Sequence, residues 1–138
     1  MQIVLLWIHL VCLAMGGAAT FGMPVIGAMM GSAPGEARAS LFAAGKRIST
    51  ISRGALVGLI VTGVILVVIG PGFGGVGAWF WVKMALVVAL IAGIVQASRA
   101  GRAAYAGDAA AAGRARTLGL VNIGLLLGIV LAAILAFG

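Results

Sequence analysis

The chain has 138 residues, of which 64% are hydrophobic and only 8% are charged. Soluble domains carry about 25% charged residues, so this composition excludes an ordinary soluble protein and indicates an integral membrane protein. The net charge of +7 would also fit a nucleic-acid-binding protein. We exclude that class because nearly all basic residues lie between long apolar segments, where they set the orientation of a membrane protein.

The first apolar segment covers residues 3–30 and contains no Asp, Glu, Lys or Arg. At about 1.5 Å per residue, about 20 helical residues cross a hydrocarbon layer about 30 Å thick, so the segment predicts a membrane span. It lacks the basic start of a signal peptide and is longer than its apolar core, so we expect it to remain in the mature protein. It contains His9, the only histidine. A titratable side chain inside a span indicates a functional role.

Three more apolar segments follow, at residues 53–70, 79–98 and 117–137. They predict an all-α fold, an integral membrane four-helix up-down bundle that forms a single domain over residues 1–138. Residues 31–52 and 99–116 are predicted to connect the spans and have an excess of Lys and Arg. The first is predicted to be a loop, and the alanine-rich stretch 103–115 of the second is predicted to be a helical extension or turn. The positive-inside rule puts both connecting segments in the cytoplasm, so both termini lie on the periplasmic side of a bacterial inner membrane.

Two pairs of glycines have the four-residue spacing that lets membrane helices approach closely. They are Gly54 with Gly58 and Gly124 with Gly128. The pattern predicts tight helix packing, either within the bundle or against a partner protein or a second copy of the chain. The alternative is chance, because the sequence is rich in Ala and Gly.

The chain has no phosphate-binding loop, no paired carboxylates and no Cys/His set with metal-ligand spacing. Its only acidic residues, Glu36 and Asp108, lie outside the predicted spans. Proton-coupled transporters commonly relay protons through carboxylates within the membrane, so a drug/proton antiporter is disfavoured.

His9 and Lys83 lie at similar predicted depths below the periplasmic face, about six and about four residues into their spans. They could therefore face each other or share a ligand. The structural alternative for His9 is a hydrogen bond to a hydroxyl or carbonyl of another helix. For Lys83 the alternative is a side chain that reaches the headgroups. Thr62, Gln96 and Asn122 are predicted to form hydrogen bonds between helices.

A neutral imidazole is a good ligand for iron or copper, and helix bundles commonly hold cofactors between facing side chains. Cys12 and Met15 are weaker candidate metal ligands near His9, and with it they would favour reduced copper. The alternative is that Cys12 and Met15 are a small apolar residue and a gap-filler.

Three stretches resemble one family. They are WIHL at residues 7–10, KRISTISRGALVGLIVTGVIL at 46–66 and WFWVKMALVVALIAG at 79–93. In this order they are similar to the HemJ-type membrane protoporphyrinogen oxidases and the related CopD-like membrane proteins. The resemblance implies a four-span bundle associated with b-type haem, with His9 and Lys83 as the important pair. It also implies a haem-dependent oxidoreductase activity of the protoporphyrinogen oxidase type.

These observations leave three hypotheses for function. The first is a redox protein that binds b-type haem through His9, with Lys83 as a second iron ligand or as a partner of a haem propionate. The second is a non-catalytic membrane subunit that packs against a partner protein. The third is copper handling by His9, Cys12 and Met15.

Overall fold

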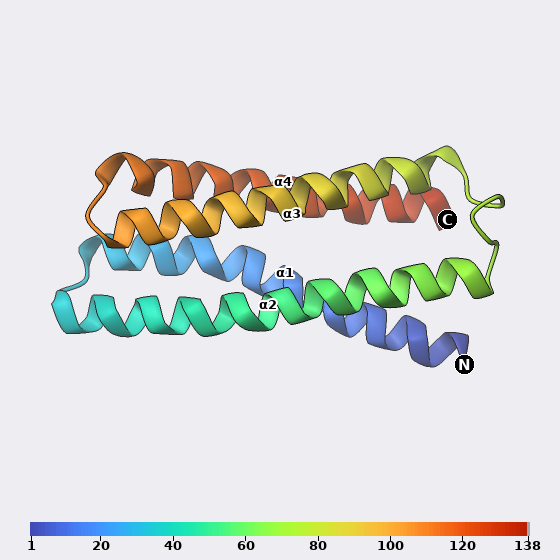
Figure 1. The fold of residues 1–138 in the computed structure, drawn as a ribbon, viewed down its shortest axis with the longest axis horizontal. Helices are drawn as coiled ribbons and strands as arrows, with labels where there is room; N and C mark the ends of the chain where they lie inside the picture. Colours follow the sequence, from blue (N-terminus) through green and yellow to red (C-terminus); the bar gives the residue numbers. More distant parts are fainter. Residues whose placement is uncertain (138) are drawn as a thin grey trace.

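The computed structural model describes residues 1–137, and this part of the chain forms four long helices. They are α1 (Gln2–Ser32), α2 (Gly35–Ile69), α3 (Ala78–Tyr105) and α4 (Ala109–Phe137). Successive helices run in opposite directions, and both ends of the chain lie at the same end of the molecule (Figure 1). Each helix is long and apolar enough to cross a membrane. The prediction of an all-α protein with four helices that are able to span a membrane is confirmed.

The helices extend well beyond the predicted spans on the side that carries most of the charges. Residues 35–52, which we expected to be part of a loop, form the first half of α2. The prediction was wrong because this segment is charged but also contains four Ala and two Arg, together with Glu, Leu and Lys, all of which are strong helix formers. Only Ala33 and Pro34 separate α1 from α2. The second basic segment is mostly helical, which agrees with the helical extension or turn predicted for its alanine-rich part: α3 continues to Tyr105 and α4 begins at Ala109.

The helices pack as two pairs, α1 with α2 and α3 with α4, and α1 also contacts α4. In Figure 1 the N-terminal half of α1 leaves α3 and α4, and its C-terminal half returns toward them. The contact between α1 and α4 uses two glycines. A Cβ atom at Gly119 would lie 2.9 Å from Pro24 Cγ, and one at Gly17 would lie 3.6 Å from Leu126.

One glycine of each predicted pair lies at a helix contact, and the other does not. A Cβ atom at Gly58 would meet the sulfur of Cys12, and one at Gly128 would meet Leu86. Gly54 and Gly124 have open space around the Cβ position. The four-residue spacing therefore identified one glycine at a helix contact in α2 and one in α4. In neither helix do both glycines of the predicted pair lie at a contact.

The core lies where the four helices come closest. Leu90, Leu126 and Ile129 are buried there against α1 and α3 side chains that include Leu13 and Leu86. An almost wholly apolar cavity of about 30 Å³ lies beside them, lined by residues of all four helices. Asn122, only 4% exposed, lies directly over the backbone of Gly93, where no side chain intervenes.

Polar contacts hold the end of the molecule where α1 joins α2 and α3 joins α4. Arg38 of α2 donates a hydrogen bond of 3.2 Å to the carbonyl oxygen of Ala104, and its guanidinium lies 5.6 Å from the Tyr105 ring centroid. Phe42 stacks on Tyr105 with ring centroids 3.9 Å apart. These contacts link α2 to α3.

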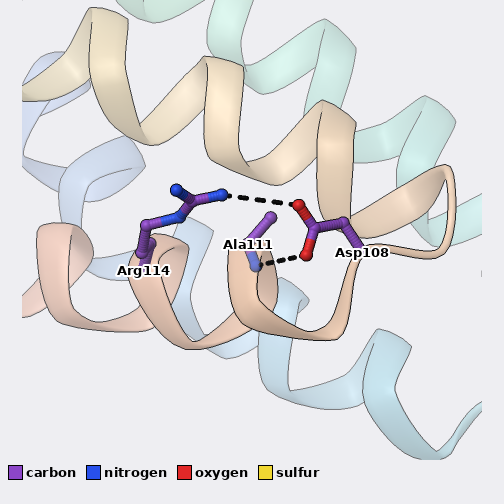
Figure 2. A network of polar contacts seen from close by, with 3 residues as sticks. All are labelled: Asp108, Ala111 and Arg114. Atoms are coloured by element: carbon purple, nitrogen blue, oxygen red, sulfur yellow. Dashed lines mark hydrogen bonds and ion pairs between the residues drawn. The ribbon is translucent and has the colours of Figure 1, made fainter.

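The turn from α3 to α4 contains Gly107 at a φ of 111°, a backbone conformation that favours glycine. Asp108 follows and caps α4, because its carboxylate accepts a hydrogen bond of 3.1 Å from the backbone N–H of Ala111 (Figure 2). The other carboxylate oxygen of Asp108 lies 3.4 Å from Arg114.

The close approach of Asn122 to Gly93 gives a test of the packing. A Cβ atom at Gly93 would collide with Asn122 Oδ1, so Gly93→Ala should lower the free energy of unfolding by about 1–3 kcal/mol. Thermal unfolding in detergent, followed by circular dichroism, measures the change. Gly124→Ala is the matched control, because space at that position is open and alanine favours a helix by about 1 kcal/mol over glycine. Equal effects of the two substitutions would contradict the packing described.

Candidate functional site around His9

His9 lies on the face of α1 that packs against α2. Its Nδ1 is 2.8 Å from Oγ1 of Thr62, which is only 7% exposed. The ring fits there because the neighbouring residue of α2 is glycine. A Cβ atom at Gly63 would lie 3.3 Å from Cε1 of His9, tighter than nearly all such contacts. His9 itself is half-buried.

The hydrogen bonds of Thr62 determine which nitrogen of a neutral His9 ring carries the proton. Thr62 Oγ1 is 2.6 Å from the carbonyl oxygen of Gly58 and 3.3 Å from that of Leu59. A hydroxyl has one proton, and the shorter contact shows that Thr62 donates it to Gly58. Its oxygen must then accept from His9, so Nδ1 carries the hydrogen in the neutral ring. The lone pair is left on Nε2.

This arrangement is the one that metal-binding histidines commonly have. One ring nitrogen donates to a hydrogen-bond acceptor, which fixes the tautomer and the ring orientation, and the other nitrogen is the ligand. The geometry therefore makes Nε2 of His9 a suitable ligand for a metal ion or a haem iron.

The two weaker candidate ligands differ in position. Cys12 is half-buried and lies against Gly58, one turn from His9 on the same side of α1. Met15 is 44% exposed. Within residues 1–137 no group of three or more His, Cys, Asp or Glu side chains comes together in a way that could hold a metal ion.

Lys83 reaches the neighbourhood of His9 from α3. It lies close enough to the His9 ring for the two to interact electrostatically. Its Nζ atom is 5.4 Å from the centroid of the Phe80 ring, a distance at which a cation interacts with the ring face. The two basic side chains that were predicted to lie at one depth thus come from different helix pairs and lie in the same neighbourhood.

The cavities limit what these residues could hold. The central cavity of about 30 Å³ reaches Leu13 and Leu59, next to the His9 site, but it has room only for about one water molecule. A larger hollow of about 450 Å³ lies at the open ends of α1 and α2, lined by Met1, Gln2, Ile3 and Ile69. The central cavity is therefore too small to hold a haem.

The other polar residues of the spans do not contribute to the site. Of the three that we expected to form hydrogen bonds between helices, only Thr62 does so. Gln96 is exposed, and Asn122 Oδ1 is buried without a hydrogen-bond partner in the described chain. The pairing of His9 with Thr62 was not predicted, although a hydroxyl partner on another helix was anticipated. The spacing from Thr62 back to Gly58, one helical turn, is the sequence feature that indicates where the hydroxyl proton goes.

Comparison of the chain with protein-family models, curated proteins and solved structures gave no match. The functional argument therefore depends on the geometry around His9.

The tautomer of His9 can be measured directly, because the chain has a single histidine. We expect nitrogen NMR of protein labelled with ¹⁵N-histidine to show, for the neutral ring, Nδ1 protonated and Nε2 unprotonated. Thr62→Val removes the acceptor and should abolish the preference, whereas Thr62→Ser retains the hydroxyl and should preserve it. A wild-type ring that is protonated mainly at Nε2 would refute the hydrogen-bond assignment.

Proposed function

We propose that this chain is a four-span protein of the bacterial inner membrane that binds a b-type haem through His9 and serves a redox role. The observation that supports the proposal is the hydrogen bond from His9 Nδ1 to Thr62, which leaves the lone pair of Nε2 free for a ligand inside an apolar span. Proteins rarely keep a titratable side chain in the membrane unless it has such a role. The resemblance of residues 7–10 and 79–93 to the HemJ-type and CopD-like proteins agrees with it.

In this proposal each residue has a distinct task. His9 supplies the axial nitrogen, and Thr62 holds the ring in the orientation and tautomer that ligation requires. Lys83 supplies a positive charge on the other helix pair, which suits a haem propionate. Alternatively, a deprotonated Lys83 is the second iron ligand. The haem would supply one-electron transfer, and the apolar surroundings would tune its reduction potential.

The proposed orientation follows from the charges. The end of the bundle where α1 joins α2 and α3 joins α4 faces the cytoplasm, because most Arg and Lys residues lie in the helix segments next to these connections, and the termini face the periplasm. His9 and Lys83 then lie in the periplasmic half of the membrane. Trp79 and Trp81, which are exposed, would lie near the periplasmic interface, where tryptophan is enriched.

Visible spectroscopy of the detergent-purified protein tests haem binding. The reduced-minus-oxidised difference spectrum should contain a sharp Soret band and α-band, and His9→Ala should abolish both. Cys12→Ser is the matched control, because Cys12 lies one turn from His9 on the same face and should leave the bands unchanged. Lys83→Gln should leave the bands in place if Lys83 pairs with a propionate, and should alter them if Lys83 is an iron ligand.

A full haem spectrum in His9→Ala would rule out His9 as the ligand. A spectrum that stays flat after haem is added would rule out the haem proposal.

A second candidate function is then a non-catalytic subunit, since only 6% of the most apolar part of α1 is buried within the chain. A colourless, metal-free preparation that copurifies with a membrane partner would support it. Copper that is lost in Cys12→Ser would instead favour copper handling.

A further inference from the structure

The stacked rings of Phe42 and Tyr105 determine how α2 and α3 lie against each other. The ring centroids are 3.9 Å apart, and the two helices run in opposite directions (Figure 1). A step forward along α2 from Phe42 and a step backward along α3 from Tyr105 therefore lead toward the same end of the molecule, the end that holds the termini. Each helix carries a basic residue one turn along this direction, Lys46 on α2 and Arg102 on α3, so the two cations lie at one level.

The two cations also lie on the same side of the ring stack, its outer side. At about 100° per residue, Lys46 is rotated by about 40° from Phe42 around α2. In the same way, Arg102 is rotated by about 60° from Tyr105 around α3. Because the helices are antiparallel, both rotations turn toward one side of the stack. Arg38, about 40° from the stack in the opposite sense, has a buried Nε atom, whereas both cations are exposed.

A third cation lies on the same face of α2. Arg53 follows Phe42 by eleven residues, a rotation of about 20°, and it is exposed like Lys46. Its Nη2 lies 3.4 Å from Oγ of Ser49, so the guanidinium is drawn back along the helix toward Lys46. We call Lys46, Arg53 and Arg102 the α2–α3 basic cluster.

No carboxylate neutralises this cluster. The chain has two acidic residues, Glu36 and Asp108. Glu36 lies about 15 Å before Lys46 along α2, and Asp108 pairs with Arg114 (Figure 2). In the part of the chain that the structure describes, none of the three cations of the cluster forms an ion pair. Because like charges on neighbouring helices repel, the cluster favours an anion between them.

We propose that the α2–α3 basic cluster binds a phosphate group, which lies between Lys46 and Arg102 and also contacts Arg53. Lysine and arginine are the usual partners of phosphate oxygens, and a guanidinium group can donate two parallel hydrogen bonds to them. The predicted spans 53–70 and 79–98 end at this level, where lipid headgroups lie. The phosphate therefore belongs to an anionic lipid or to a soluble phosphate compound. This proposal does not depend on the haem proposal.

Three other exposed arginines provide a matched control set. Arg47 is rotated by about 140° from the ring stack around α2, and Arg99 by about 120° around α3. Arg116 belongs to α4. These three side chains carry the same total charge as the cluster but do not face the space between α2 and α3.

Native mass spectrometry of the full chain in detergent, with dioleoyl-phosphatidylglycerol as the lipid probe and glycerol 3-phosphate as the soluble probe, tests the proposal. The variant K46Q/R53Q/R102Q should bind the probe about a hundredfold more weakly than the wild type, since each basic residue near an anionic headgroup contributes about fivefold. R102Q alone should weaken binding about fivefold, because α3 supplies part of the site. The control R47Q/R99Q/R116Q should change the affinity by less than about threefold.

Competition between the probes identifies the source of the phosphate. Bound phosphatidylglycerol that millimolar glycerol 3-phosphate does not displace supports the site with a lipid as the occupant. Displacement at that concentration supports the site with a soluble phosphate compound as the occupant.

The remaining outcomes would overturn the site. They are equal weakening by the two triple glutamine variants, no effect of R102Q, and no binding of either probe to the wild type. K46R/R53K/R102K conserves the charge and should bind within about fivefold of the wild type. If it binds as weakly as K46Q/R53Q/R102Q, the loss does not come from charge, and the proposal fails.

Discussion

A hydroxyl group has a single proton, and inside a bilayer it has no water with which to share it. Thr62 donates that proton to the carbonyl oxygen of Gly58 on its own helix, so its oxygen is left to accept from His9. The ring tautomer and the identity of the nitrogen with the free lone pair depend on this one hydrogen bond, which is also one of the contacts between α1 and α2. The small size of Gly63 makes it possible, because any larger residue would push the ring away from Thr62.

The two ends of the bundle are built differently. At the end that carries the helix connections, Arg38, Phe42 and Tyr105 link the helix pairs, and Pro24 fits against Gly119. At the other end α1 leaves α3 and α4 (Figure 1), and α1 is the least buried of the four candidate spans. His9 is therefore held on its α2 side by Thr62 and remains half-buried overall.

The sequence predicted the number of helices and their apolar segments because mean hydropathy and length are properties of the segments themselves. It could not separate a charged loop from a charged helix, so residues 35–52 were assigned incorrectly. It identified His9, Lys83 and Thr62 as polar residues in spans. The pairing of His9 with Thr62 depends on the rotation of two helices about their axes, to which Cys12 against Gly58 and His9 against Gly63 both contribute. No single-helix pattern contains that information.

The two helix pairs contribute different parts of the structure: α3 and α4 supply the buried apolar cluster, and α1 and α2 supply the candidate site around His9. The buried apolar cluster of Leu90, Leu126 and Ile129 belongs to α3 and α4, and α4 is the most buried span. The α1–α2 pair carries the His9 site. Because α1 contains no Asp, Glu, Lys or Arg, α2 supplies both the hydroxyl that orients His9 and the charged side chains of this helix pair. Substitutions near Thr62 on α2 can therefore change the His9 site while the α3–α4 core remains intact.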